Sequence, residues 1–213
     1  MKLKNKRVLI TAGPTWVKID KVRVISNTAS GKTGLLFADA FKRLGSKVTL
    51  LLGPINLPLQ KRSITVKKYK FFDELNNLIK KELKNKKYDI AIHSAAVSDY
   101  APCMPYPKKI KSNLKSLTIK FKPTFKIIRL FKKIQPKIFL IGFKYEPEAK
   151  KDNLYKEAVK LIRQSCADLV ISNTVKDGKY SAFLMEENKI SKVFKDRESL
   201  VKGAIKIIGG YYA

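Results

Sequence analysis

The feature that most constrains this chain is the alternation of short apolar runs with segments that carry apolar side chains at helical spacing. Residues 7–12 form an apolar run that closes in a Gly-Pro turn, which is typical of a buried strand. Residues 35–44 then show helical spacing and end at Gly45, a usual C-cap, before a second apolar run at residues 48–52. These segments together predict a βαβ unit.

The alternation continues to the C-terminus. The sequence predicts further strands at residues 64–69, 89–93, 117–121, 138–143 and 168–172, helices at residues 72–83, 125–134, 151–163 and 198–208, and a hairpin formed by residues 181–184 and 189–193. This pattern favours an α/β, Rossmann-like fold: a mostly parallel sheet with helices on both faces, plus a small hairpin extension. Such sheets bind ligands at the carboxyl ends of their strands. No internal repeat or linker divides the chain, so we expect a single domain over residues 1–213.

Composition narrows the class of protein. With 213 residues, 45% of them hydrophobic, the chain can build one core that buries roughly 70% of its unfolded surface. No apolar run approaches the roughly 18 residues of a membrane-spanning helix, and the N-terminus leads straight into the first strand without a signal-peptide core. We therefore expect a cytoplasmic protein with no membrane partner.

Cysteine and histidine are too few for a disulfide framework or a zinc site. The chain has only Cys103, Cys166 and His93, and neither cysteine shows a paired metal-ligand spacing. No nucleophile signature surrounds either cysteine, so a catalytic Cys/His pair is not favoured. A core or strand-end role is the ordinary interpretation of His93.

The net charge of +29 fits nucleic acid, an anionic membrane surface or a solvated basic surface. The lysines are spread along the chain without a helix-turn-helix, zinc-finger or RNA-recognition signature, which argues against nucleic acid as the main ligand. One stretch differs: between Tyr100 and Tyr145 there are twelve Lys or Arg residues and no Asp or Glu. Three prolines exclude regular structure in residues 101–113, so we predict a flexible basic flap there, suited to a small polyanion.

The Gly-Lys-Thr sequence at residues 31–33 is not a P-loop. That motif needs a glycine where this chain has Ser26, and it follows its strand directly, whereas about eighteen residues intervene here. The dinucleotide glycine fingerprint is also incomplete. What remains is a pair of glycine-bearing turns at residues 11–15 and 30–34. The second opens a helix, where free amides and the helix dipole favour an anion; simple capping by Ser30 is the alternative.

Polar side chains flank these turns. Asn27 precedes the second turn, and Asp99 follows the small-residue stretch at residues 94–98, where a ligand can approach the backbone. Asp99 could bind a ribose hydroxyl or a Mg²⁺-bound water. Both residues could equally be ordinary turn residues.

Taken in order, several segments resemble the phosphopantothenoylcysteine synthetase family over essentially the whole chain. They are residues 8–13, 19–27, 30–34, 95–100, 109–111, 142–143 and 171–173. Mild departures are Pro14, Ala29 and Ser112, and residues 122–128 and 142–146 look like archaeal members. In many organisms this domain is fused behind a flavin-dependent decarboxylase; nothing precedes the first strand here, so we expect only the synthetase part.

The resemblance implies a two-step ligase reaction in coenzyme A biosynthesis. A nucleoside triphosphate, with CTP favoured over ATP, activates the carboxylate of 4'-phosphopantothenate as an acyl nucleotide and releases pyrophosphate. The amine of cysteine then attacks to form the amide. Mg²⁺ is expected to accompany the nucleotide, near Asp99 and without direct protein ligands.

The resemblance also implies roles for individual residues. Lys109 and Asn27 are expected to be catalytic, in the first and second half-reactions respectively, and Arg23, Asn27 and Ala96 to hold the acid substrate. The positions implied for nucleotide binding are Gly13, Ser30, Gly31, Lys32, His93, Ser94, Ala95, Asp99, Lys109, Thr124, Phe125, Lys126, Ile127, Phe143 and Lys160. A second downstream lysine is expected near Gln164 or Ser165, where this chain has none, and Arg163 is a possible substitute.

The family's implied partners are a second copy of the chain, in a homodimer with the active site near the interface, and a separate flavin-dependent decarboxylase. Two alternatives stay open. An NAD(P)-dependent reductase shares the architecture, although the chain lacks the glycine fingerprint and a Tyr-x-x-x-Lys after the fourth strand. A non-catalytic basic nucleic-acid-binding protein is the other.

Overall fold

A large, mostly parallel sheet forms the centre of the molecule. The computed structural model describes residues 2–56 and 64–212, and within them the central sheet has eight strands in the order β12-β11-β10-β9-β6-β1-β4-β5. Six strands run parallel, namely β5 (Thr65–Lys68), β4 (Lys47–Leu52), β1 (Arg7–Ala12), β6 (Ile90–His93), β9 (Phe139–Tyr145) and β10 (Leu169–Lys176). The strands β11 (Lys179–Glu186) and β12 (Lys189–Ile190) extend the sheet antiparallel. The expected Rossmann-like α/β class is confirmed.

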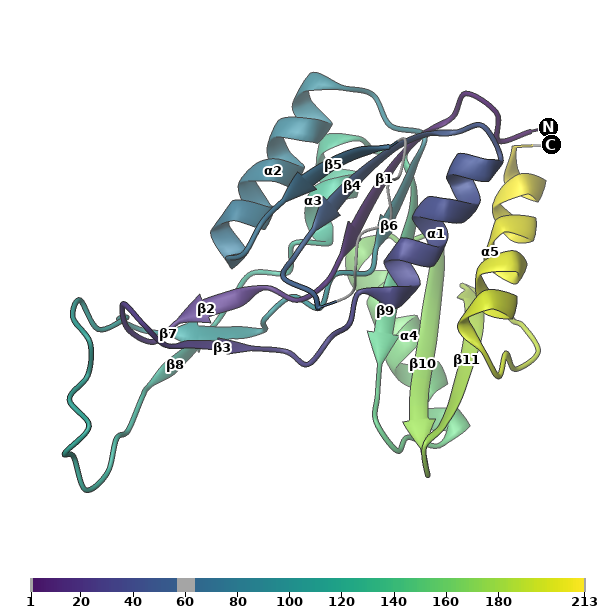
Figure 1. Cartoon of the computed structure of the whole chain (residues 1–213). Helices are drawn as coiled ribbons and strands as arrows, with labels where there is room; N and C mark the ends of the chain where they lie inside the picture. Colours follow the sequence, from purple (N-terminus) through teal and green to yellow (C-terminus); the bar gives the residue numbers. More distant parts are fainter. Residues whose placement is uncertain (1, 57–63, 213) are drawn as a thin grey trace.

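Helices cover both faces of this sheet (Figure 1). The helices α1 (Lys32–Arg43) and α5 (Arg197–Tyr211) pack on one face, and α2 (Phe72–Asn85), α3 (Arg129–Ile134) and α4 (Lys151–Ser165) on the other. Neighbouring residues of one strand therefore enter different cores: Ile10 packs with Phe37 and Leu200, whereas Leu9 packs with Leu75 and Phe131. Because both faces are buried, these strands are continuously apolar instead of alternating.

The strand order fixes where a ligand can bind. From β1 the chain proceeds outward to β4 and β5, and it then returns to the other side of β1 at β6. Connections leave β1 and β6 in opposite directions, which opens a crevice at their carboxyl ends. His93, the last residue of β6, pairs with Thr11, one residue before the end of β1.

An arm projects from the carboxyl end of the sheet. We use this name for residues 16–26 and 100–123, which comprise the antiparallel pairs β2 (Trp16–Lys18) with β3 (Val24–Ser26) and β7 (Tyr100–Pro102) with β8 (Phe121–Pro123). Figure 1 shows both pairs leaving the sheet together, and the Tyr106 N–H donates to the Ile19 carbonyl at 2.8 Å. The hairpin β2–β3 interrupts the βαβ unit that the sequence predicts.

The arm also accounts for two wrong sequence predictions. Residues 117–120 form no strand. Strand pairing in this stretch begins only at β8, whose partner is β7 and which lies outside the central sheet. Residues 101 and 102, predicted as loop, belong to β7, a two-stranded ribbon in which Pro102 is tolerated at an edge.

Two further predictions have the right element but the wrong bounds. The helix expected from residue 125 begins only at Arg129, because Thr124 is held extended: its N–H donates to the Asp99 carbonyl at 2.8 Å and its Oγ1 to the Ser98 carbonyl at 2.7 Å. The C-terminal hairpin is mainly β10 with β11, which pair over seven residue pairs, whereas β12 contributes two residues.

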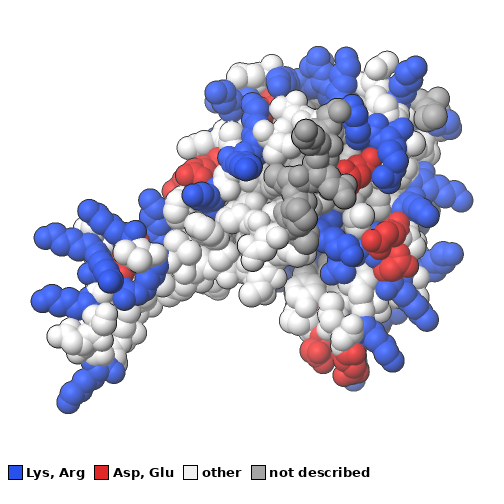
Figure 2. Space-filling view, viewed as in Figure 1, with Lys and Arg blue, Asp and Glu red and all other residues white. Residues whose placement is uncertain are grey.

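Basic residues are spread over the visible face of the molecule, including the far end of the arm (Figure 2). None of the helices in residues 2–56 and 64–212 is long and apolar enough to cross a membrane.

Gly34 offers a direct test of how closely α1 approaches the sheet. A Cβ atom at Gly34 would lie 2.5 Å from the Ala12 Cβ and 2.6 Å from the Ser94 Oγ, so Gly34→Ala should lower the free energy of unfolding by about 1–3 kcal/mol in denaturant titration. The matched variant Gly209→Ala, in α5, meets nothing within 4 Å and should leave stability unchanged or raise it by up to about 1 kcal/mol. Equal effects of the two substitutions would contradict this account of the packing.

Candidate active site

A cleft of about 900 Å³ lies at the carboxyl end of the sheet, beside the ends of the paired strands β1 and β6. It is lined by the turn that opens α1, the chain after β6, the segment before α3 and one side of α4, together with residues near the ends of β9 and β10 and the first residue of α5. The structure brings together most of the residues that the sequence singles out. They are Asn27, Ser30, Gly31, Lys32, His93, Ser94, Ala95, Ala96, Asp99, Thr124, Phe125, Lys126, Ile127, Phe143 and Lys160.

The two glycine turns touch each other at the floor of the cleft. Gly13 and Gly31 have φ angles of 84° and 72°, and a Cβ at Gly31 would lie 3.2 Å from the Gly13 nitrogen. Gly31 is the N-cap of α1, and no side chain caps the first turn; Ser30 Oγ accepts only a 3.3 Å hydrogen bond from the Lys32 N–H. The first turn also has no acidic residue. Its amides and the positive end of the helix dipole therefore favour an anion in the cleft.

Asn27 bridges this turn to the end of β6. Its Nδ2 donates to the carbonyls of Ala96 and Val97, at 3.2 and 3.3 Å. In the part of the chain that the structure describes, no group donates to its Oδ1. A ligand in the cleft can therefore use Oδ1 as a hydrogen-bond acceptor.

Asp99 and Lys126 form an exposed ion pair on the opposite rim. Their Oδ1 and Nζ atoms are 2.6 Å apart, and the side chains are 63% and 54% exposed, so a ligand can replace this contact at little cost. Thr124, bonded to the backbone of Ser98 and Asp99, keeps the segment before α3 against the end of β6. These two stretches form one wall, although 27 residues separate the ion-paired side chains.

His93 is a buried, neutral member of the same wall. Its Nδ1 lies 2.9 Å from the Thr11 Oγ1, which accepts the Ala95 N–H at 3.2 Å. Thr11 is fully buried, and among the described residues its hydroxyl has no other acceptor, so we infer that it donates to Nδ1 and that the ring proton is on Nε2. Burial lowers the pKa of His93 to about 4, so the imidazole is uncharged at neutral pH.

The wall formed by β9 and α4 contains functional candidates that the sequence reasoning missed. Lys144 Nζ lies 2.8 Å from Glu146 and 3.1 Å from Glu157, and Lys160 approaches Glu157 at 3.9 Å. The hydrogen bond from Lys144 holds the pKa of Glu157 below its usual value. Both members of the Lys144–Glu157 pair line the cleft. No motif signals these residues, because their meeting depends on how α4 packs on β9.

The sequence suggests Arg163 as a substitute for the second downstream lysine, which is expected near residues 164 and 165. Gln164 lines the cleft, whereas Ser165 is buried and bonds to the Leu161 carbonyl. Arg163 is not among the lining residues, but Arg129 and Arg197 are.

Three of the predicted residues lie outside the cleft. Gly13 is beneath its floor, where its carbonyl accepts the Ala96 N–H at 3.0 Å. Arg23 and Lys109 are on the arm; Lys109 is exposed, and the Arg23 guanidinium bonds to Asp20 and to the carbonyl of Ile110.

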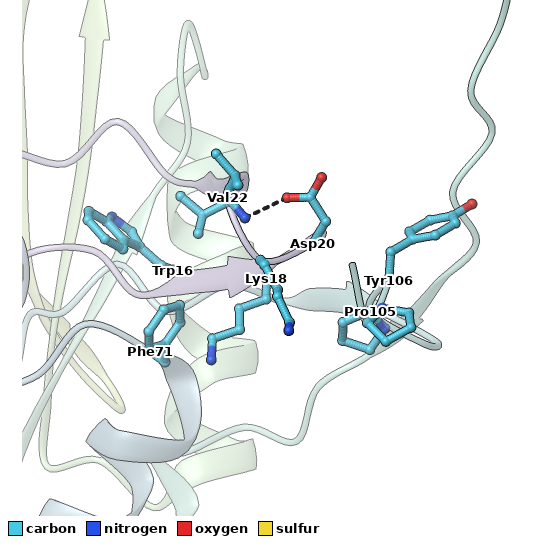
Figure 3. A pocket seen from close by; sticks show the side chains of 10 residues that line it. Trp16, Lys18, Asp20, Val22, Phe71, Pro105 and Tyr106 are labelled. Carbon is cyan, nitrogen blue, oxygen red and sulfur yellow. Dashed lines mark hydrogen bonds between the residues drawn. The ribbon is translucent and has the colours of Figure 1, made fainter. Parts of the chain in front are cut away.

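A second hollow, of about 590 Å³, lies along the arm and is lined by none of the predicted site residues. Figure 3 shows Trp16 and Phe71 at one end and Pro105 and Tyr106 at the other, with Asp20 between them bonded to Val22. The rings of Trp16 and Phe71 meet edge to face, with centroids 6.1 Å apart. This hollow joins the arm to the start of α2.

The low pKa of His93 predicts a specific dependence of stability on pH. Between the usual pKa of 6.5 and the folded value of about 4, the unfolded chain binds the proton and the folded chain does not, so stability is lost as the pH falls through this window. His93→Asn cannot ionise and keeps an acceptor for Thr11. In denaturant titrations between about pH 7 and pH 4.5, the unfolding free energy of the parent should fall by on the order of 2–3 kcal/mol more than that of the variant. Equal losses in the two proteins would refute a buried neutral imidazole.

Comparison with known proteins places this geometry in a family. The sequence model of the protein family described as the DNA/pantothenate metabolism flavoprotein C-terminal domain matches residues 3–206. The chain is 39% identical over 195 residues to the coenzyme A biosynthesis bifunctional protein CoaBC of Thermococcus kodakarensis, covering 91% of this chain and 46% of that protein. It is 30% identical over 197 residues to CoaBC of Bacillus subtilis, again covering 91% and 46%. The chain thus spans about half the length of the curated relatives it matches.

Solved structures agree over almost the whole chain. The DNA/pantothenate metabolism flavoprotein from Streptococcus pneumoniae superposes with a TM-score of 0.87 at 26% identity, covering 97% of this chain and 99% of that one. The C-terminal domain of a CoaBC protein gives a TM-score of 0.78 at 26% identity, covering 99% and 97%. The resemblance seen in the motifs is confirmed, and this chain belongs to the family of the DNA/pantothenate metabolism flavoprotein C-terminal domain.

Proposed function

We propose that this chain is a phosphopantothenate–cysteine ligase of coenzyme A biosynthesis. A carboxylate oxygen of 4'-phosphopantothenate attacks the α-phosphorus of a nucleoside triphosphate and pyrophosphate leaves. The cysteine nitrogen then attacks the acyl carbon and the nucleoside monophosphate leaves. The observation that carries the proposal is that one cleft joins the anion-binding turn at Gly31 to the chain after β6, with Asn27 between them. Family membership and the relatives named CoaBC support it.

The cleft has two chemically different ends that suit a nucleotide. At one end, the first turn of α1 and the side chain of Lys32 favour the phosphates, whose negative charge grows as pyrophosphate leaves. At the other end, the segment 124–127 offers apolar surface and backbone polar groups for a base. Phe143 lies on the α1 side of the cleft, where its ring meets Phe37 edge to face with centroids 6.3 Å apart. Recognition of CTP in preference to ATP is part of the proposal and rests on the family resemblance.

Mg²⁺ is expected to bind through the nucleotide. In residues 2–56 and 64–212 no three His, Cys, Asp or Glu side chains come together as a metal site, and Asp99 is a single exposed carboxylate at the rim. These residues fit an ion held mainly by phosphates and water, as is usual for Mg²⁺. Bound in this way, it would neutralise charge on the phosphates.

Asn27 is proposed to act in the second half-reaction. Its Nδ2 is engaged by the carbonyls of residues 96 and 97, which fixes the plane of the amide at the junction of the two ends of the cleft. The Oδ1 atom can then accept a hydrogen bond from the attacking amine. Holding two reactants in the right orientation lowers the activation barrier by far more than the free energy of the single hydrogen bond.

The arm suggests a homodimer. Arg23 and Lys109 do not line the cleft of their own chain, and the arm exposes apolar side chains such as Val22, Tyr100 and Met104, which are 66%, 59% and 82% exposed. Contiguous exposed apolar groups mark interaction surfaces. We propose that the arm of one chain meets a second copy near its cleft. Because the relatives are bifunctional, a separate flavin-dependent decarboxylase is a further proposed partner.

The reaction is tested by following pyrophosphate with the pure protein, phosphopantothenate, Mg²⁺ and each of the four triphosphates, with and without cysteine. Release is expected with CTP above the other three. No release with any nucleotide would end the ligase proposal. Salt-sensitive binding of RNA or duplex DNA without nucleotide binding would favour the nucleic-acid alternative.

Two substitutions separate the half-reactions. Asn27→Asp should let the acyl nucleotide accumulate, because activation proceeds and attack by cysteine slows. Lys109→Gln should slow acyl nucleotide formation on the order of a hundredfold, since it removes a charge that the leaving pyrophosphate needs. Lys115→Gln, at an exposed lysine just beyond the flap, is the matched control. If Asn27→Asp and Lys109→Gln both behave like Lys115→Gln, the site assignment fails even when the parent is active.

A further inference from the structure

One carboxylate near the tip of the β2–β3 hairpin has an unusual number of partners. Asp20 lies in the turn between the two strands, and its side chain is fully buried. Its Oδ1 accepts the N–H groups of Val22 and Arg23, at 2.7 and 2.6 Å. These bonds close the turn, as Asp commonly does, and involve only one of the two oxygens.

The other oxygen reaches the second half of the arm. Oδ2 accepts the N–H of Ile110, 90 residues away, at 3.0 Å, and Nη1 of Arg23 at 2.5 Å. The same Nη1 donates to the Ile110 carbonyl at 3.2 Å. The Asp20–Arg23 pair thus forms hydrogen bonds with both the N–H and the carbonyl of Ile110.

The chemistry of these contacts makes them strong. Hydrogen bonds to an ionised carboxylate are stronger than those between neutral groups, and Asp20 accepts four. The Ile110 N–H is the foremost cause that holds the pKa of Asp20 well below its usual range, so the carboxylate stays ionised. Its surroundings are cationic: Lys18, Lys21 and Arg23 are on the hairpin, and the flap has no acidic residue.

We propose that Asp20 is a positioning residue, which sets Lys109 through the neighbouring backbone of Ile110 and sets Arg23 through its guanidinium. Lys109 and Arg23 are then held at a fixed position relative to each other when a substrate binds. The inference rests on the proposed function for the roles of Lys109 and Arg23. It goes beyond that function in assigning Asp20, which touches no cleft residue, to the first half-reaction.

The substitution Asp20→Asn separates the turn from the flap. The amide oxygen can still accept from Val22 and Arg23, but an NH₂ group replaces the oxygen that meets Ile110 and the guanidinium. Acyl nucleotide formation should slow on the order of tenfold to a hundredfold, and trypsin should cut faster at the flap lysines, with the unfolding midpoint close to that of the parent. Asp73→Asn removes an equal charge from an exposed site on α2 and should change none of these.

A double variant distinguishes positioning from general destabilisation. Because Asp20 is proposed to act through both Lys109 and Arg23, Asp20→Asn should slow acyl nucleotide formation less in the Lys109→Gln background than in the parent, since only the route through Arg23 remains. Losses that multiply, or a parent-like rate for Asp20→Asn alone, would overturn the inference.

Hydrogen exchange of the Ile110 amide tests the contact in the unaltered protein, whether or not the variant folds. Slow exchange is expected, and exchange as fast as in an open loop overturns the proposal. If the parent releases no pyrophosphate, the proposed function fails, and so does the assignment of Asp20 to the reaction, while slow exchange would still establish the anchoring of the flap.

Discussion

The contact between the two glycine turns at Gly13 and Gly31 is the constraint on which the rest of the site depends. Both residues adopt positive φ; a side chain at Gly31 would meet the backbone of Gly13, and one at Gly13 would meet the backbone of Gly53, which follows β4. Their approach starts α1 directly beside the end of β1 with Gly31, which has no side chain, as its N-cap; Ser30 Oγ accepts only from the Lys32 N–H. An anion site therefore arises from backbone geometry at the point where the sheet opens, without a P-loop.

Acidic residues, which are few, mainly hold cationic neighbours in place. The chain has 17 Asp and Glu against 46 Lys and Arg. Glu82 is buried and bonds to Lys67 and the Tyr88 hydroxyl, Asp168 pairs with Lys132 at 2.7 Å, and Asp20 holds Arg23. The lysines that line the cleft are paired in the same way: Lys32 with Glu198, Lys126 with Asp99, and Lys144 and Lys160 with Glu157. An anionic ligand in the cleft would therefore compete with these carboxylates for the lysines.

Much of the sheet could be predicted from the sequence, because buried parallel strands are continuously apolar and the helices between them are amphipathic. The prediction of a strand at residues 117–121 was wrong, because strand formation there depends on a pairing partner that the local pattern does not reveal. The motif segments converge on one cleft because strand ends share one edge of the sheet. Lys144, Glu157 and Arg197 were missed, since they reach the cleft through tertiary packing. The roles of the assembled residues remain proposals.

The hydrogen bond between the Ile110 N–H and Asp20 has a consequence for the order in which the molecule folds. The β2–β3 hairpin is local and can form once residue 26 is available, but its contact to the flap spans 90 residues. Closing so long a loop is slow unless the intervening chain is already compact. The intervening strands β4, β5 and β6 belong to the central sheet, so the two halves of the arm come together after that sheet has formed. The walls of the cleft would then be assembled before the arm is complete.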